Sequence, residues 1–290
     1  MVRQAVVAGS FYPLDSKLLD KKIIACFKSK FGPKKLPGKL KKERVTVAVV
    51  PHAGYDYSGP CAAHVYKILA ESQKPDIVVI VGTNHSGMGP SVSVFKAGDW
   101  QTPFGIAKVD TEFADTIIKN SSFARPDEFG HKVEHSIEVQ LPFLQKIYQE
   151  FKFVPIVMKG LHVFQETEDL ANAIIVAAKK LKKHVLVIAS SDFTHYGPSY
   201  NYTPFKSKAK ECVVKLDKDS ITKIEKLDDV GFLKQIIKTG STVCGYPAIT
   251  LAIVFAKKKG LKKMKLLKYY TSGEISKDYS NFVGYASLVA

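Results

Sequence analysis

Short runs of apolar, mostly β-branched residues recur along the chain, and stretches with helical periodicity separate them. The runs at residues 45–51, 77–83 and 185–191 carry no charge, which is typical of parallel strands buried on both faces. The same patterns predict further strands near 92–95, 106–109, 153–158, 265–270 and 282–288, and helices near 15–30, 60–71, 112–119, 134–144, 167–182, 204–217, 228–238 and 247–259. They predict one α/β domain over residues 1–290, with helices flanking a central mixed sheet in three layers. The sheet is expected to be mainly parallel, with an antiparallel edge.

Each of the three uncharged strands ends just before a histidine. His52 follows the first strand, His85 follows the second, and Asp192 and His195 follow the third. In open α/β sheets, ligands bind outside the carboxyl ends of the parallel strands. These side chains are therefore expected to meet at one edge of the sheet, as a metal or catalytic centre.

His52, His85 and Cys244 are the candidate metal ligands. Imidazole is the commonest metal ligand in proteins, and glycines beside both histidines permit a close approach to a ligand. Cys244 precedes a helix predicted to begin at Pro247, and a helix N-terminus stabilises a thiolate, which can bind metal or act as a nucleophile. The alternatives are histidines that only bond a loop backbone and a buried, inert thiol.

Asp192, His195 and His135 are the candidate catalytic residues. An acid and a base at the end of one strand can exchange protons, or can orient a metal-bound histidine. Asp192 could equally cap a turn. Glu134 is expected to favour the positive end of a helix dipole, and His135 beside it is a candidate to reach the same pocket. The other histidines are interpreted as structural or surface residues: His64, His131, His162 and His184.

The chain is strongly basic, with a net charge of +16, but only three of its 43 basic residues are arginine. Bidentate phosphate recognition favours arginine, and lysine enrichment is also found in proteins from hot environments. Nucleic acid is therefore not the expected partner. There is no phosphate-binding loop, no dinucleotide-binding glycine motif and no Gly-x-Ser-x-Gly motif, so no nucleotide cofactor is expected.

The four cysteines are too far apart for a Cys-x-x-Cys motif, and Cys26, Cys61 and Cys212 are expected to be buried, free thiols. No apolar run approaches the roughly 18 residues of a membrane helix. The N-terminus lacks the pattern of a signal peptide. These features predict a cytoplasmic protein with no membrane partner.

Several short motifs together resemble those of the Memo family (mediator of cell motility homologues), and they span nearly the whole chain. In order they are Ala8-Gly9-x-Phe11-Tyr12-Pro13, Pro51-His52-Ala53-Gly54-Tyr55-x-Tyr57-Ser58-Gly59, Asn84-His85, Glu134-His135-Ser136-x-Glu138, Ser191-Asp192-Phe193-Thr194-His195-Tyr196 and Thr242-x-Cys244-Gly245.

This resemblance implies a fold similar to that of the class III extradiol ring-cleavage dioxygenases, which use non-haem iron(II). It places His52, His85 and Cys244 at the metal-ligand positions, with Asp192 and His195 beside them. Prokaryotic members are often encoded near a radical-SAM protein and an AMMECR-type partner. Animal members are described as binding phosphotyrosine peptides and as iron- or copper-dependent redox proteins.

The third ligand position departs from the dioxygenase pattern of two histidines and one carboxylate. Cys244 stands there, and a thiolate is softer, which favours copper(I), zinc or a different iron chemistry. This argues against catechol cleavage, unless Asp192 turns inward and supplies a carboxylate.

Three classes of function follow. The leading hypothesis is a metal-dependent redox enzyme, a dioxygenase-like oxidoreductase that uses iron(II) or copper, with zinc as a further option, on a small-molecule or peptide substrate. In this hypothesis His195 transfers protons, and Asp192 either orients a metal-bound histidine or binds the metal itself. The second is a metal-free enzyme with Cys244 as nucleophile and a nearby histidine as base. The third is a binding protein for an anionic or phosphorylated peptide.

Overall fold

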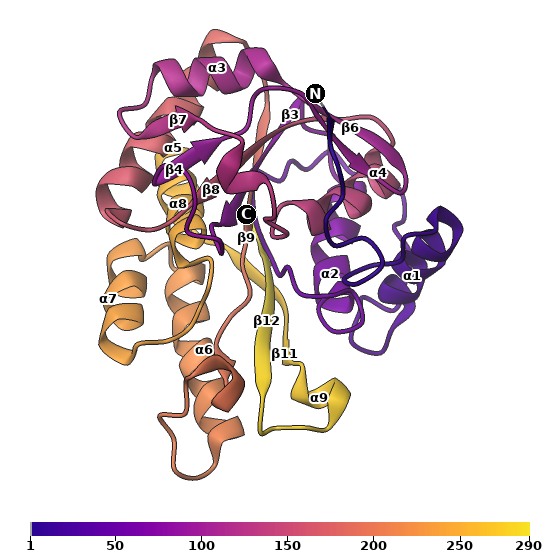
Figure 1. The fold of residues 1–290 in the computed structure, drawn as a ribbon, viewed down its shortest axis with the longest axis vertical. Helices are drawn as coiled ribbons and strands as arrows, with labels where there is room; N and C mark the ends of the chain where they lie inside the picture. Colours follow the sequence, from indigo (N-terminus) through magenta and orange to yellow (C-terminus); the bar gives the residue numbers. More distant parts are fainter. Residues whose placement is uncertain (1) are drawn as a thin grey trace.

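A large β-sheet forms the middle of the molecule in the computed structural model, which describes residues 2–290 (Figure 1). Twelve strands of this part of the chain join in that one sheet. The strands are β1 (Val2–Arg3), β2 (Val47–Val50), β3 (Ile77–Thr83), β4 (Val92–Val94), β5 (Asp99–Thr102), β6 (Gly105–Val109), β7 (Ala124–Pro126), β8 (Lys152–Met158), β9 (Val185–Ser190), β10 (His195–Tyr196), β11 (Lys265–Thr271) and β12 (Phe282–Val289).

Helices separate most of these strands along the chain. They are α1 (Ser16–Lys28), α2 (Gly59–Ala70), α3 (Thr111–Lys119), α4 (Leu141–Tyr148), α5 (Val163–Lys180), α6 (Ala209–Glu225), α7 (Asp229–Thr239), α8 (Tyr246–Lys258) and α9 (Gly273–Ser276), with single 3-10 turns at Phe129–His131, Glu138–Gln140 and Pro198–Tyr200.

The helices begin where the sequence supplies a start signal. The side chain of Asp15 caps α1 by accepting a hydrogen bond from the backbone N–H of Leu18 at 2.8 Å. Pro60 and Pro247 lie in the first turns of α2 and α8, where a residue without an N–H costs nothing. Both proline starts confirm the prediction from the sequence.

The sheet is parallel in its middle, as predicted, and has antiparallel pairs towards both edges. Its main path runs β1-β5-β6-β8-β3-β9-β2-β12-β10, and the pairs from β6 through β8, β3 and β9 to β2 are parallel. The neighbours β12 and β11 then add antiparallel pairs. The parallel strands are buried on both faces, which explains their lack of charge.

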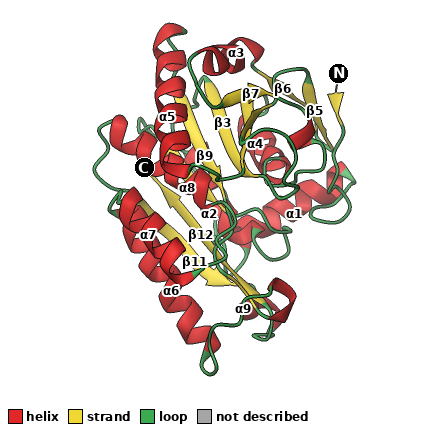
Figure 2. Ribbon diagram, turned by 60° about the vertical axis from the view of Figure 1, so that its left-hand side comes forward, coloured by secondary structure: helices red, strands yellow, loops and turns green. Residues whose placement is uncertain are grey.

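Helices cover both faces of the sheet (Figure 2) and give the three layers expected from the sequence. Alternate residues of one strand enter different cores. Val47 and Val49 of β2 pack with α5 and α8, whereas Ala48 and Val50 pack with α1, α2 and α4. This alternation follows from the two-residue period of a strand.

The carboxyl ends of β2, β3 and β9 lie side by side. Val50 pairs with Ser190, and Val81 pairs with Ala189, so the three strands end at nearly the same level. The segments that carry His52, His85 and Asp192 therefore leave the sheet at a common edge, as the sequence predicted.

The prediction of a helix at 134–144 is wrong for its first half. Residues 134–137 are not helical, a 3-10 turn spans Glu138–Gln140, and α4 begins only at Leu141. Pro142 lies in the first turn of α4, where it starts the helix instead of kinking it. The preceding segment is held in an irregular conformation by buried hydrogen bonds of Glu134 and Glu138.

Three further expectations need correction. The helix predicted near 204–217 begins later, at Ala209, because Lys208 adopts a left-handed backbone conformation (φ 51°). Trp100 lies within β5, a strand that is missing from those predicted. Cys212 is only half-buried on α6, whereas Cys26 and Cys61 are buried as predicted. Within residues 2–290, no helix combines the length and apolar character needed to cross a membrane.

A buried carboxylate, Asp217 on α6, joins several elements near β10. It accepts hydrogen bonds from the backbone N–H (3.2 Å) and hydroxyl (2.5 Å) of Thr194, and from the hydroxyl of Tyr269 (2.8 Å). Its side chain is fully buried. Burial raises the pKa of Asp217 to about 6, and the hydrogen bonds only partly offset this effect.

Replacing Asp217 with asparagine should stabilise the protein at pH 8 but not at pH 4. The folded pKa lies above the unfolded one, so ionisation of Asp217 costs stability as the pH rises from about 4 to 6. The rise in the pKa of Asp217 corresponds to a gain of at most about 3 kcal/mol in the free energy of unfolding of the asparagine variant at pH 8. Urea unfolding at both pH values measures the gain, with the exposed Asp219→Asn on the same helix as the matched control. Equal gains at pH 4 and pH 8 would contradict this assignment.

Candidate metal centre

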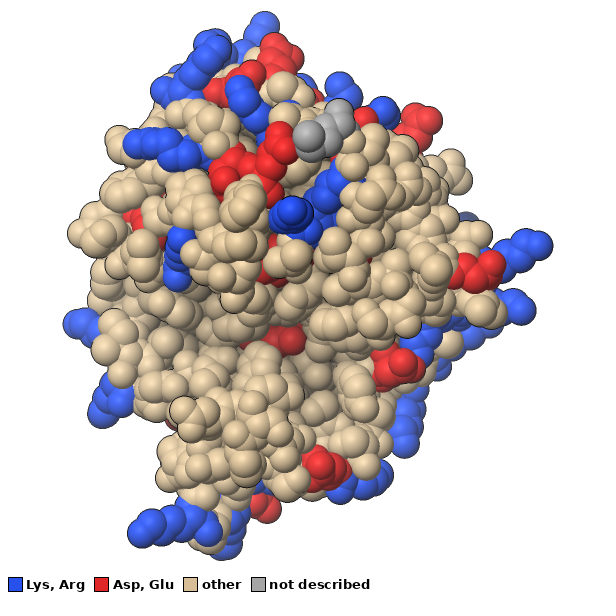
Figure 3. All heavy atoms as spheres, in the orientation of Figure 1, with Lys and Arg blue, Asp and Glu red and all other residues tan. Residues whose placement is uncertain are grey.

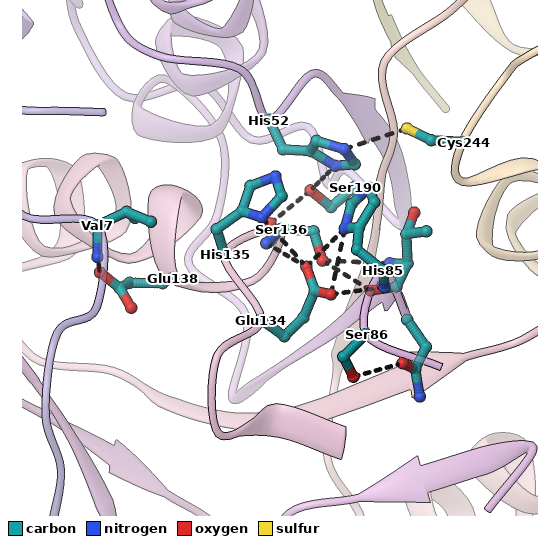
Figure 4. A network of polar contacts seen from close by, with 12 residues as sticks. Val7, His52, His85, Ser86, Glu134, His135, Ser136, Glu138, Ser190 and Cys244 are labelled. Carbon is teal, nitrogen blue, oxygen red and sulfur yellow. Dashed lines mark hydrogen bonds and ion pairs between the residues drawn. The ribbon is translucent and has the colours of Figure 1, made fainter. Parts of the chain in front are cut away.

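The side chains of His52, His85 and Cys244 converge at the carboxyl edge of the sheet (Figure 4). Each offers one ligand atom, and these three atoms all lie within 4.8 Å of one another. His52 Nε2 lies 3.1 Å from Cys244 Sγ. The imidazole rings of His52 and His85 meet edge to face, with centroids 5.3 Å apart. The structure thus brings together residues that are up to 192 positions apart in the chain.

A buried polar network fixes the tautomer of His52. The hydroxyl of Ser190 donates its proton to the carbonyl of Ser136 at 2.6 Å, so it can only accept from His52 Nδ1 at 3.2 Å. Ser190 also accepts from the amide of Gln140, whose own oxygen accepts from Tyr66. His52 therefore carries its proton on Nδ1 and presents the lone pair of Nε2 towards Cys244.

Glu134 orients His85 in the same manner. Its carboxylate lies 2.9 Å from His85 Nδ1 and also accepts the backbone N–H groups of His85 and Ser136 at 2.8 Å. With Nδ1–H donated to Glu134, Nε2 of His85 is the nitrogen left to face the centre. A carboxylate bound to the far nitrogen of an imidazole is a common partner of metal-bound histidine.

The pKa values of His85 and Glu134 are set by their mutual contact, whereas the pKa of His52 is set mainly by burial. Burial alone would lower the pKa of His85, but the nearby Cys244 thiol and the Glu134 carboxylate raise it to about 10. Burial alone would raise the pKa of Glu134, but the hydrogen bond and charge of His85 lower it to about 2. For His52, burial and the neighbouring histidines hold the pKa well below its usual value. Without an ion, His85 is therefore a cation and His52 is neutral.

Cys244 lies one residue before Gly245, the N-cap of α8. The backbone N–H of Gly245 donates to the hydroxyl of Ser191 at 3.0 Å, which fixes the loop against the end of β9. A side chain at Gly245 would collide with Ser191 and with the carbonyl of Ser190, so this close approach requires glycine. The half-buried thiol is thereby held opposite His52.

The three ligand atoms fit a metal ion. Bonds of about 2.0–2.3 Å from nitrogen and sulfur to an ion imply ligand atoms roughly 3.3–3.8 Å apart in a tetrahedral site. The observed His52–Cys244 distance of 3.1 Å and the 4.8 Å limit for the group require only small side-chain adjustments. Three protein ligands leave at least one coordination position open, as in catalytic metal sites.

His135 lies against both histidines of the centre. Its ring stacks on His85 with centroids 4.6 Å apart and an interplanar angle of 20°. It also meets the edge of His52 at 5.4 Å. Burial lowers the pKa of His135 to about 4, so it stands beside the centre as a neutral imidazole. His85, Glu134 and His135 form a second group whose ligand atoms lie within 4.8 Å of one another.

Asp192 and His195 lie beside the centre. Among the described residues, neither belongs to a group able to hold an ion. The carboxylate of Asp192 is buried and accepts the backbone N–H of His52 at 2.8 Å, so it fixes the His52 loop. His195 Nδ1 donates to the carbonyl of Thr242 at 3.0 Å, two residues before Cys244. Its Nε2 carries the lone pair.

The sequence interpretation missed the residues that orient the two imidazoles. Glu134 was assigned to a helix dipole, yet it is buried and holds His85. Ser190 and Gln140 were not singled out, although both stabilise the tautomer of His52. The only signal for Glu134 was its place beside His135 and Ser136 in a short motif.

Known proteins match this chain in sequence over nearly its full length. A family model described as "Memo-like protein" matches residues 3–289. A MEMO1 family protein of Methanopyrus kandleri is 42% identical over 291 residues, covering 100% of this chain and 99% of the relative. A MEMO1 family protein of Methanobrevibacter smithii is 44% identical over 290 residues, covering 99% of both.

A solved structure also resembles this fold. The crystal structure of an uncharacterized protein, JW3007 from Escherichia coli K12, matches with a TM-score of 0.51 and 11% sequence identity. The match covers 85% of this chain and 99% of that protein. At this level of identity the likeness concerns the fold alone.

Proposed function

The chain belongs to the Memo family, and on that premise we propose that it binds a redox-active metal ion, iron or copper, through His52, His85 and Cys244. The observation that carries the proposal is the convergence of three ligand atoms within 4.8 Å of one another. Both imidazoles have their Nδ1 protons bound elsewhere, so each offers Nε2 to the centre. A bound ion would supply electron transfer and an open coordination position.

The donor set narrows the choice of ion. Two imidazoles and a thiolate suit iron, copper(I) or zinc, whereas magnesium and calcium prefer oxygen ligands. The Cys244 thiolate would favour soft ions, and zinc would bind without redox chemistry. We therefore propose an oxidoreductase acting on a small-molecule or peptide substrate, with iron or copper as its cofactor.

The residues around the centre then have distinct roles. His195 is held by Thr242 with its Nε2 free, so it can take up and return a proton. Asp192 fixes the backbone at His52 and thereby the direction of that ligand. His135, stacked on His85, forms one wall of the pocket as a neutral acceptor or donor.

Metal content tests this proposal. Protein purified without oxygen and without added metal should carry about one iron or copper ion per chain by elemental analysis. Reconstitution of metal-free protein should saturate at the same ratio. Protein that contains no transition metal, and takes up none from iron(II) or copper(I), would refute the proposal.

A second candidate function rests on a different observation at the same centre. The thiol of Cys244 lies 3.1 Å from Nε2 of His52, and Ser190 holds the other ring nitrogen of that imidazole. In a metal-free protein, His52 could take up the thiol proton and make Cys244 a nucleophile, with Ser190 orienting the base. The protection of Cys244 from alkylation, treated in the Discussion, separates the two candidates.

Capture of an anionic peptide has less support. Figure 3 shows lysine and arginine side chains mostly around the outline of one face, with an acidic group on the floor of its central hollow. Arg3, one of the three arginines, is buried and paired with Glu138. That pairing leaves Arg3 unable to bind an external phosphate.

A further inference from the structure

The N-terminal segment, residues 3–12, crosses the molecule next to the candidate metal centre. We call these residues the N-terminal strap. Its first residue, Arg3, lies in β1 beside Trp100 of β5, and its last, Tyr12, is buried. The strap contacts two of the loops that carry the centre: the loop after β2, with His52, and the irregular segment with Glu134 and His135.

The strap is anchored on Glu138, which is fully buried. The Glu138 carboxylate accepts the backbone N–H groups of Val6 and Val7 at 2.9–3.1 Å and the hydroxyl of Tyr12 at 2.6 Å. It also pairs with the guanidinium of Arg3 at 2.7 Å. A single carboxylate therefore holds both ends of the strap.

Arg3 continues this network to the backbone at Glu134. Its Nη2 donates to the carbonyl of Glu134 at 2.7 Å, and its Nε donates to the carbonyl of His131 at 2.8 Å. The guanidinium also lies 3.9 Å from the centroid of Trp100. Arg3 thus makes forked contacts that a lysine cannot reproduce. They fix the main chain at the residue whose carboxylate orients His85.

The C-terminal end of the strap contacts the loop that carries His52. The carbonyl of Phe11 accepts the backbone N–H of Tyr55 at 2.8 Å, three residues after His52. The ring of Phe11 lies 4.9 Å from the ring of His135. One continuous segment therefore connects the His52 loop to the segment with Glu134.

We propose that Arg3 and Glu138 are positioning residues that set the separation of His52 and His85 through the N-terminal strap. Arg3 fixes Glu134, Glu134 fixes His85, and Phe11 ties the same segment to the loop of His52. The inference rests on the proposed function only where metal affinity is concerned. The predicted effect on the orientation of His85 follows from the hydrogen bonds of the strap and does not require a bound metal.

The first test is the affinity of metal-free protein for cobalt(II), a probe with a visible thiolate band. Glu138→Gln and Arg3→Lys preserve size or charge but break the network. Both should bind cobalt(II) about 10-fold more weakly, the lower end of the range for loss of an outer partner of a metal ligand, because they act on His85 only through Glu134. The matched control is Lys183→Met, which removes the 2.7 Å ion pair with Asp110 near the start of β9. It should bind within about twofold of the original protein.

The second test reads the orientation of His85 without any metal. In ¹H–¹⁵N spectra of metal-free protein, the Nδ1–H of His85 should give a slowly exchanging signal because Glu134 accepts it. Glu138→Gln and Arg3→Lys should broaden or lose this signal, and Lys183→Met should retain it. Thermal unfolding of all variants shows whether the fold is kept, and the spectra are recorded well below each transition.

The two tests distinguish a failure of the positioning role from a failure of the metal function. Folded strap variants with unchanged cobalt affinity and an unchanged His85 signal would overturn the positioning role. An original protein that binds no cobalt(II), but whose His85 signal depends on Arg3 and Glu138, would refute the metal function and support the strap. Loss of both affinity and signal only in the strap variants supports both.

Discussion

Alanine at both His52 and His85 is expected to leave the protein without a bound metal ion. Two of three ligands are removed, and the remaining thiolate of Cys244 cannot hold an ion alone. Losing an outer partner costs about 10- to 100-fold in affinity, so losing two ligands should exceed 100-fold. Elemental analysis of the purified double variant should find less than about a tenth of an ion per chain.

The control for this experiment is a histidine outside the centre. His64 is half-buried on α2, and its Nε2 hydrogen-bonds the carbonyl of Phe31, so His64→Ala should keep the metal content of the original protein. Circular dichroism must show that the double variant is folded. Unchanged metal content in folded His52→Ala/His85→Ala protein would place the ion elsewhere.

Alkylation of Cys244 by iodoacetamide is expected to be slow while metal is bound and fast after a chelator removes it. A thiolate that binds an ion has its lone pair engaged, so the chelator should accelerate the reaction roughly tenfold or more. Burial raises the pKa values of Cys26 and Cys61 to about 12, so these thiols stay unreactive in the folded protein. Mass spectrometry of the digested protein measures the modification of Cys244.

Cys212 provides the internal reference. It is half-buried on α6, away from the three ligands, so its rate should not respond to the chelator. In a Cys212→Ser background, Cys244 becomes the reactive thiol of the chain. Fast alkylation of Cys244 at a rate that the chelator does not change would instead favour the metal-free cysteine nucleophile, with His52 as its base.

The sequence allowed prediction of the central sheet and of the convergence at its edge. Uncharged, β-branched runs such as residues 77–83 are typical of buried strands, and parallel strands bring their carboxyl ends to one edge. His52 and His85 follow such ends directly, so their positions depended little on distant contacts. Cys244 could be predicted because a glycine-bounded loop before a helix exposes its thiol.

The orienting residues could not be predicted in this way. Glu134 binds His85 across 49 positions, and nothing in the local pattern distinguishes a buried acceptor from a helix-start glutamate. Glu138 falls within the predicted helix at 134–144, and nothing in that pattern indicates that it is buried and accepts donors from the N-terminal segment. Short strands such as β1 and β5 form through mutual pairing, which a short, weakly patterned segment does not reveal.

X-ray absorption at the metal edge identifies the atoms bound to the ion. Ligation by His52, His85 and Cys244 should give nitrogen neighbours at about 2.0–2.1 Å and one sulfur neighbour at about 2.3 Å. The sulfur shell should disappear in Cys244→Ser, while the nitrogen shell from His52 and His85 remains. A spectrum without sulfur in the original protein, or one that Cys244→Ser leaves unchanged, would contradict this ligation.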